Sequence, residues 1–152
     1  MNYNYNPLHI VNAYGAFGSV TRERYEVIVE GSASGGDDWK AYEFRAKPGA
    51  ATRRPPQVPP YHLRLDWLMW FLPLRGFRYP EVWFVRMLDR LLEGDPAILR
   101  LLRHNPFTER PPRAVRALMY HYEFTTPAER AKTGAIWNRE QVAEYARRGG
   151  EC

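Results

Sequence analysis

Residues 24–30 alternate between apolar and polar side chains with the two-residue period of a β-strand, and residues 114–125 form the longest strand candidate. These two segments constrain the fold more than any other feature. In residues 24–30, Tyr25, Val27 and Val29 fall on one face and charged residues fall on the other, with Ile28 as the exception. In residues 114–125, apolar side chains occupy both faces, which is typical of a central strand that is covered on both sides. Together the two segments predict a sheet with residues 114–125 in its interior.

A second alternating segment, residues 39–47, follows residues 24–30 after a polar, glycine-rich loop at residues 31–38. This arrangement predicts an antiparallel hairpin. Three of its side chains are expected to point inward and three outward: Tyr42, Phe44 and Ala46 inward, and Glu43, Arg45 and Lys47 outward. Residues 8–14 are expected to add a further strand before the hairpin.

The middle of the chain carries the start and stop signals of helices. Asp66 precedes an apolar turn at residues 67–72 and is expected to cap it. Residues 81–93 form an amphipathic pattern, and Asp95 with Pro96 begins a second helix directly afterwards. The two predict a short-linked helical hairpin.

Near the C-terminus, Thr126 and Glu129 have the spacing of a capping box, which predicts a short helix. Residues 136–145 are also expected to be helical. The resulting prediction is an α+β fold: an antiparallel sheet of three to four strands, packed against a helical hairpin and short helices, in a single domain over residues 1–152.

Composition limits the classes of function. The net charge of +5 is spread along the chain, as in a mixed solvated surface. The single cysteine, Cys152, cannot form a disulfide within the chain or a cysteine-based metal site. No signal peptide is apparent, and the most apolar run, residues 65–74, is interrupted by Asp66 and Pro73. We expect no metal and no cofactor.

Established catalytic motifs are absent, and the four histidines are scattered without ligand-like spacing. The polar candidates are Glu23, Asp66 and Arg116. Extending the strand period turns Glu23 inward, where Arg116 would neutralise it; the alternative is a strand end in solvent. Asp66 either caps its helix or is the acidic residue of a pocket whose walls are Trp67, Trp70 and Phe71. Packing in the core is the simpler role for the tryptophans.

Three functions therefore remain open. The chain is expected to be a binding module rather than an enzyme, with a charge-rimmed apolar or aromatic patch. One alternative is an enzyme with an unrecognised polar pocket near Asp66, Glu23 and Arg116. The other is an anion-binding or nucleic-acid-binding domain. The partner-binding surface is predicted to comprise Tyr14, Phe17, Arg22, Arg24, Arg53, Arg54 and Tyr61.

Several short segments are common when taken singly, but their combination in this order is specific to one protein family. They are Tyr14-Gly-Ala-Phe-Gly-Ser-Val-Thr-Arg-Glu-Arg-Tyr-Glu-Val, Arg53-Arg-Pro-Pro, Leu65-Asp-Trp, Leu91-Leu-Glu-Gly-Asp-Pro, Asn105-Pro-Phe, Pro111-Pro-Arg and Tyr120-His-Tyr-Glu-Phe-Thr. In this order and spacing the chain resembles the C-terminal domain of the lipase maturation factor family, from about residue 8 to residue 145.

The resemblance implies a soluble domain that follows the membrane-spanning helices of its parent protein. In eukaryotes it would lie in the endoplasmic reticulum, on the lumenal side, and in bacteria at the cell membrane. It implies a chaperone-like role in which the domain binds a lipase-type client protein and assists its maturation. No nucleic acid is expected as a partner, and the family offers no catalytic residue to transfer to this chain.

Overall fold

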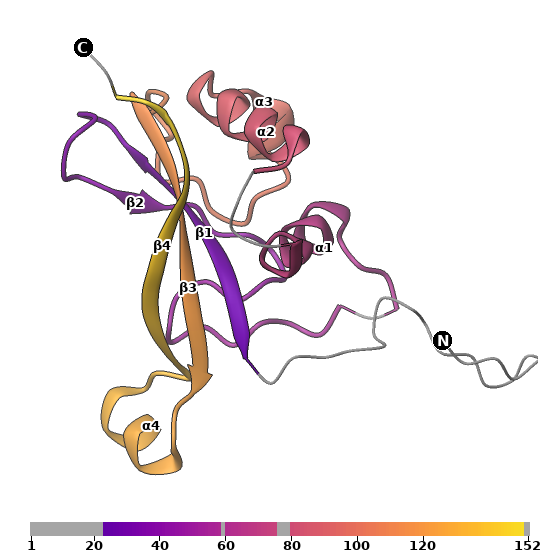
Figure 1. The fold of residues 1–152 in the computed structure, drawn as a ribbon, viewed down its shortest axis with the longest axis vertical. Coiled ribbons are helices and arrows are strands. Elements are labelled where there is room, and N and C mark those ends of the chain that lie inside the picture. The colour runs from indigo at the N-terminus through magenta and orange to yellow at the C-terminus, as the bar shows by residue number, and fades with distance from the viewer. Residues whose placement is uncertain (1–22, 59, 76–79, 151–152) are drawn as a thin grey trace, which may run out of the picture.

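The computed structural model describes residues 23–58, 60–75 and 80–150 of the chain. Within these ranges the strands form a four-stranded antiparallel sheet in the order β2-β1-β3-β4 (Figure 1). The strands are β1 (Arg24–Ser32), β2 (Lys40–Ala41), β3 (Ala114–Phe124) and β4 (Trp137–Gly149). The helices are α1 (Arg64–Phe71), α2 (Val82–Leu92), α3 (Pro96–Leu99) and α4 (Pro127–Thr133), with a 3-10 turn at Pro73–Arg75. The predicted α+β class is confirmed.

The centre of the sheet follows the prediction. β1 pairs with β3 along its whole length, from Arg24 opposite Tyr122 to Ser32 opposite Ala114. β3 has a neighbour on each side, because β4 pairs with its other edge. The apolar residues on both faces of β3 are therefore explained by its central position.

The hairpin after β1 is shorter than predicted. Only Lys40 and Ala41 pair with β1 as a regular strand, although Tyr42 and Phe44 are buried as expected. The prediction that Lys47 points outward is wrong. Its side chain is buried, because the chain turns across the sheet after Ala46 and brings the ammonium group to the Val27 carbonyl, 2.9 Å away.

Residues 136–145 were predicted to be helical, and this prediction is wrong because residues 137–145 belong to β4. Two register irregularities lie opposite Ala117/Leu118 and Met119/Tyr120, and they break the two-residue period of β4. Most of its residues are also exposed, since β4 is an edge strand. The alternation that marks a strand in a sequence is therefore missing here.

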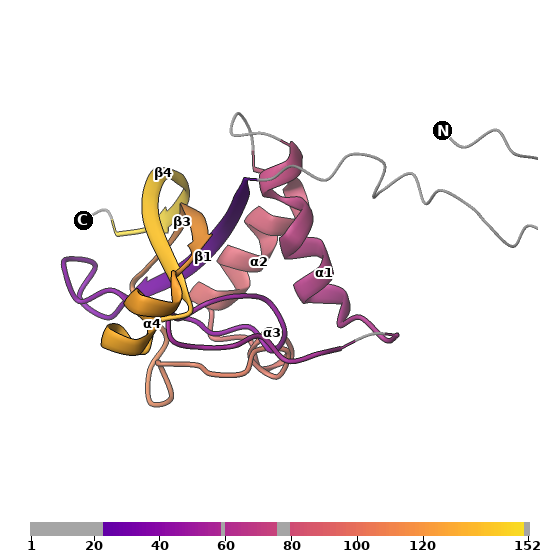
Figure 2. The ribbon, with the colours of Figure 1, turned by 90° about the horizontal axis from the view of Figure 1, so that it is seen from below.

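The helical hairpin is confirmed. Asp95 caps α3 through its carboxylate, which accepts a hydrogen bond of 2.7 Å from the backbone of Ala97. The capping box of α4 is also present, formed by Thr126 and Glu129. Helices α1 and α2 lie side by side on one face of the sheet (Figure 2).

The main core lies between that face and the helices. It includes fully buried side chains from both layers, among them Val27, Val29, Phe84 and Leu88. A smaller cluster occupies the opposite face: Ile28, Tyr122 and Trp137. Among the described residues no helix is long and apolar enough to cross a membrane.

Candidate functional site

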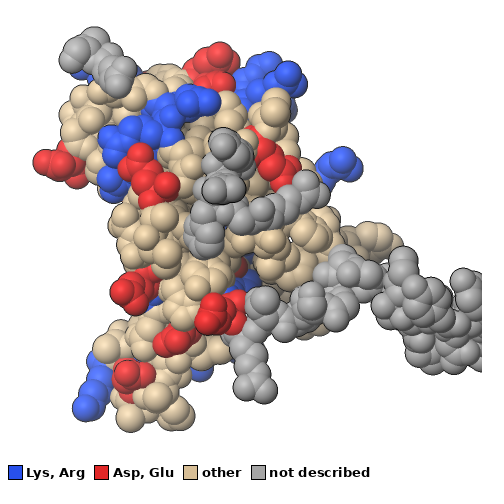
Figure 3. Space-filling model, in the orientation of Figure 1, with Lys and Arg blue, Asp and Glu red and all other residues tan. Residues whose placement is uncertain are grey.

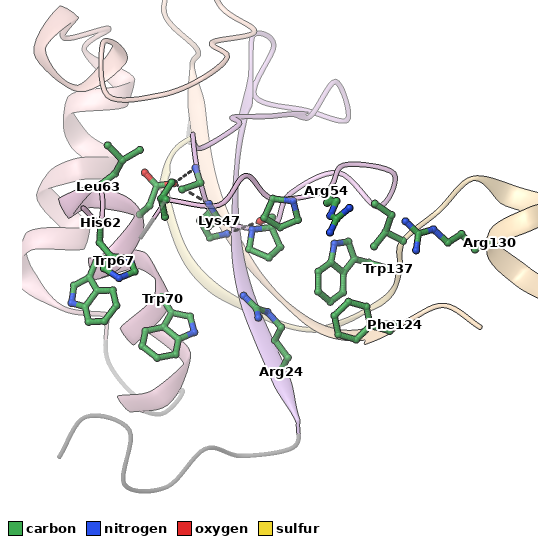
Figure 4. Close-up of a pocket in the computed structure, with 16 residues that line it drawn as sticks. Arg24, Lys47, Arg54, His62, Leu63, Trp67, Trp70, Phe124, Arg130 and Trp137 are labelled. Carbon is green, nitrogen blue, oxygen red and sulfur yellow. Dashed lines mark hydrogen bonds between the residues drawn. The ribbon is translucent and has the colours of Figure 1, made fainter. Parts of the chain in front are cut away.

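An open groove of about 720 Å³ lies between α1 and the place where β3 ends and β4 begins (Figure 4). Segments that are distant in the sequence meet around it. They are the start of β1, the turn after residue 45, the proline-rich segment after Arg53, α1, and the β3–α4–β4 connection. The sixteen lining residues are Arg24, Ala46, Lys47, Pro48, Arg54, Pro55, Val58, His62, Leu63, Asp66, Trp67, Trp70, Phe124, Arg130, Ile136 and Trp137.

Helix α1 supplies the first wall. Trp67 and Trp70 both line the groove, with ring centroids 5.3 Å apart. His62 extends the wall, 4.7 Å from the ring of Trp67. Both tryptophans are half-buried rather than part of the core, which was the simpler expectation for them. Phe71, the third predicted wall residue, packs edge-on against Trp67 and is not among the lining residues.

The second wall comes from the C-terminal end of β3 and the N-terminal end of β4. Phe124 stacks on Trp137 with a centroid distance of 4.3 Å and an interplanar angle of 27°. Trp137 is buried, whereas Phe124 is 74% exposed, a large apolar side chain left in solvent. Figure 4 shows this stack across the groove from Trp67 and Trp70. The groove therefore has aromatic rings on two facing sides.

Asp66 fixes the base of the first wall. Its carboxylate accepts hydrogen bonds from the backbone N–H groups of Ala46 and Lys47, at 2.6 and 3.0 Å. The predicted cap is wrong, because α1 begins at Arg64 and its N-cap residue is Leu63. Of the two interpretations of Asp66, the pocket is the one that matches the structure: Asp66 is the acidic residue among those that line the groove.

Beside Asp66 lies a buried ionic cluster on β1. Lys47 Nζ is 3.2 Å from Glu26 Oε2, and both side chains are almost fully removed from solvent. Arg24 binds the other carboxylate oxygen of Glu26 through Nε and Nη2, at 2.9 and 2.7 Å. The guanidinium of Arg24 also lies over the Trp137 ring, 5.6 Å from its centroid. Glu26 therefore balances one of the two positive charges nearest the groove floor.

The turn that crosses the sheet is anchored at its other end by Tyr122. The Tyr122 hydroxyl donates a 2.7 Å hydrogen bond to the Gly49 carbonyl. Burial raises the pKa of Tyr122 above its usual value, so the hydroxyl stays neutral and remains a donor. This anchor holds the groove floor against the sheet.

Arg54 and Arg130 lie at the rim. Both side chains belong to exposed residues, and within the described part of the chain neither forms a salt bridge. Figure 4 shows both on the side of the groove that carries Trp137. Their positive charges are therefore available to a partner.

A different cationic cluster lies at the other end of the sheet. Arg116 and Arg147 both lie over the Trp39 ring, at 4.1 and 5.5 Å from its centroid. Each has its own carboxylate, because Arg116 pairs with Glu30 at 2.8 Å and Arg147 pairs with Glu144 at 2.7 Å. In the space-filling view, blue and red atoms are correspondingly intermixed over the upper part of the sheet (Figure 3). This cluster has less unbalanced charge than the rim of the groove.

The predicted pairing of Glu23 with Arg116 is wrong. Glu23 precedes β1 and is exposed, and its Oε2 atom accepts a hydrogen bond of 3.1 Å from the Tyr25 hydroxyl. Arg116 lies opposite Glu30, close to the other end of β1, and binds that carboxylate instead. The enzyme alternative required Asp66, Glu23 and Arg116 to line one pocket. In the structure Asp66 lines the groove, whereas Glu23 and Arg116 do not.

The predicted binding residues divide into four groups. Arg24 and Arg54 line the groove, whereas Tyr61 is 86% exposed and lies outside its lining. Arg53 turns inward and donates to the carbonyl oxygens of Phe44, at 2.7 Å, and Arg45. Tyr14, Phe17 and Arg22, like the strand expected at residues 8–14, lie outside the described residues.

Sequence reasoning missed Phe124, Arg130 and Trp137 as lining residues. The capping box places Arg130 on a helix just after the strand that ends at Phe124, so their proximity to one another could be inferred. No signal in the sequence indicates that they would face α1. Among the described residues no cluster of three His, Cys, Asp or Glu side chains could hold a metal ion. What the groove offers is aromatic surface next to positive charge.

Comparison with known proteins gives a consistent result. The family model for the lipase maturation factor C-terminal domain matches residues 10–147. Lipase maturation factor 1 of Homo sapiens is 47% identical over 152 aligned residues, which cover 95% of this chain and 27% of that protein. Lipase maturation factor 2 of Mus musculus is 39% identical over 144 residues, which cover 91% of this chain and 20% of that protein. No solved structure matches the chain.

Proposed function

The chain belongs to the lipase maturation factor family, and from this premise we propose that it binds incompletely folded lipase polypeptides and assists their maturation. The chain spans about a quarter of the length of the lipase maturation factor 1 relatives that it matches. We propose that this domain contributes one part of the maturation activity of the complete proteins. We assign to this domain the task of holding the client.

One observation carries this assignment: aromatic rings line the groove on two facing sides, with Phe124 74% exposed, beside arginines that have no acidic partner in the described residues. An apolar groove that is rimmed by charge is typical of a binding surface. Segments that later become the core of a lipase are apolar, and they are accessible only before folding is complete. Rings on two walls can hold such a segment reversibly, because apolar contact is not directional.

The position in the parent protein is also part of the proposal. The matched region accounts for a minority of each relative's length, which leaves room for the membrane-spanning part expected from the family. In a eukaryotic parent the groove would then lie on the lumenal side of the endoplasmic reticulum, where secreted lipases fold. Tethering at that surface would raise the effective concentration of the domain near its clients.

The experiment uses a purified secreted lipase that is denatured in guanidinium chloride and then diluted into buffer with or without the 152-residue chain. We expect the chain to bind the diluted lipase in a pull-down and to raise the yield of active enzyme. A denatured protein of similar size that is not a lipase serves as the client control. Equal binding to both would show a general affinity for unfolded chains and would contradict a lipase-directed role.

Two tryptophan variants test whether the groove is the surface responsible. We expect Trp70→Ala to reduce lipase binding at least several-fold, because Trp70 lines the groove. Trp83→Ala is the matched control: Trp83 is also half-buried but lies on α2, outside the groove lining. Thermal unfolding of both variants separates a loss of binding from a loss of fold. Equal losses of binding in the two variants would place the client elsewhere.

A further inference from the structure

We propose that the groove selects extended segments in which acidic side chains stand next to large apolar ones. This inference rests on the proposed function and names the chemistry of the client segment that the groove accepts. It is drawn from the distribution of charge and aromatic surface around the lining.

The charge of the lining is strongly one-sided. Four of the sixteen lining residues are Lys or Arg, and Asp66 is the acidic one among them. Both backbone N–H bonds to Asp66 end on Oδ1, and Oδ2 has no hydrogen-bond partner among the described residues. Glu26 balances one of the two positive charges of Arg24 and Lys47, and both cations are held against it. Arg54 and Arg130 form no salt bridge within the described residues, so they are the cations that an incoming carboxylate would meet first. A guanidinium can bind a carboxylate through two parallel hydrogen bonds, which gives direction as well as attraction.

The apolar surface lies directly beside these cations. Phe124 and Trp137 are stacked on the side of Arg54 and Arg130, and Trp67 and Trp70 face them across the groove (Figure 4). A segment that places a carboxylate at the arginines therefore places its neighbouring side chains between aromatic rings. Apolar neighbours would gain buried surface there, whereas polar neighbours would lose hydration without a replacement.

The shape favours a polypeptide over a lipid surface, which could also combine anionic groups with apolar chains. The lining residues belong to two walls and a floor, and Asp66 and Trp137 are each only 5% exposed. A flat array of headgroups would reach the rim but not these deeper residues. An extended chain can enter a groove side chain by side chain, because its side chains project alternately to two sides.

The test measures the binding of three dye-labelled synthetic peptides to the 152-residue chain by fluorescence anisotropy. The first peptide combines glutamates with phenylalanine and leucine. The second replaces the glutamates with lysines, and the third replaces the apolar residues with serines. We expect the first peptide to bind on the order of tenfold more tightly than either of the others, and its affinity to weaken as salt is added.

The double variant Arg54→Glu with Arg130→Glu should reverse the preference, so that the lysine peptide binds more tightly than the glutamate peptide. The double variant Arg86→Glu with Arg113→Glu is the control, because both residues are exposed, lie outside the groove lining and form no salt bridge within the described residues. It changes the net charge equally and should keep the original preference. Equal binding of the glutamate and lysine peptides to the unaltered chain, or equal effects of the two double variants, would overturn the inference.

Three further outcomes are informative. If phosphatidylserine vesicles bind through Arg54 and Arg130 while the glutamate peptide does not, the rim is a lipid site and the inference is wrong. If denatured lipase is captured but the peptides show no preference, the proposed function stands and the inference fails. If the peptide preference is present but no lipase is captured, the charge selection holds and the assigned client is wrong.

Discussion

The ammonium group of Lys47 lies 3.2 Å from the carboxylate of Glu26, and both side chains are almost fully buried. The same ammonium donates hydrogen bonds to the carbonyl oxygens of Val27 and Pro48, at 2.9 and 3.2 Å. Lys47 thus joins the turn at the groove floor to β1 by charge and by hydrogen bonding together. A buried ion in such a position depends on every one of its partners.

Replacing Lys47 with methionine removes the cation and leaves the buried Glu26 with Arg24 as its remaining positive partner in the described structure. We expect Lys47→Met to lower the free energy of unfolding by about 3 kcal/mol, the lower end of the cost of breaking a buried ion pair. Urea unfolding measures the change. Lys40→Met is the control, because Lys40 is exposed on β2 and should alter stability by less than about 0.5 kcal/mol.

The elements that could be predicted from the sequence are those whose local residue pattern matches the burial of their side chains in the structure. β1 was identified from its alternation, and β3 from apolar residues on both of its faces, which fits a strand that is covered on both sides. Helices α2 and α4 were identified from their apolar stripe and their capping box, which are local signals. None of these elements depends on knowing what lies far along the chain.

β4 and the burial of Lys47 were missed for a shared reason. Each is determined by a neighbour that is distant in the sequence: β4 by the free edge of β3, and Lys47 by Glu26. The groove shows the same limit. The sequence could suggest Asp66, Trp67 and Trp70 as one wall, as the alternative to a cap and core packing, because they lie close together on one helix. The opposite wall comes from residues more than fifty positions later.

Asp66 offers a second test of the groove floor. Substitution with alanine removes the acceptor of the Ala46 and Lys47 N–H groups, which then lie in a largely buried position without a partner. We expect Asp66→Ala to lower the free energy of unfolding by about 2 kcal/mol. Asp66→Asn keeps one oxygen acceptor and should cost clearly less. Equal losses in the two variants would show that the charge, and not the hydrogen bonding, is what matters at this position.

Acid sensitivity should arise in the loop between β1 and β2. The Asp38 carboxylate accepts hydrogen bonds from the Ser32 and Ser34 hydroxyls and from the backbone of Ser34 and Ala33, and these bonds hold the pKa of Asp38 well below its usual value. A carboxyl group with a lowered folded-state pKa stabilises the fold above its unfolded pKa of about 3.9, and this contribution is lost as the pH falls towards the folded value.

We therefore expect the free energy of unfolding to decrease as the pH is lowered below about 4, and to decrease less steeply in Asp38→Asn. Asp37→Asn is the control, since Asp37 is the adjacent exposed residue and should keep the steeper dependence. Urea titrations at several pH values measure the slope. Asp95 and Glu129 also have lowered pKa values, through hydrogen bonds from the Ala97 and Thr126 backbones, so some dependence should remain in both variants.

Alanine substitutions at two glycines with positive φ can distinguish the cost of backbone strain from the cost of steric conflict. Gly134 ends α4 with φ of 68°, and a Cβ atom there would meet nothing within 4 Å. Gly149 ends β4 with φ of 70°, but a Cβ atom would lie 2.3 Å from the carbonyl oxygen of Arg113, which belongs to the backbone leading into β3. We expect Gly134→Ala to cost about 1 kcal/mol, the conformational term alone. Gly149→Ala should cost clearly more, because the backbones of two paired strands would have to separate; a similar cost for both variants would show that the end of β4 is loose enough to move.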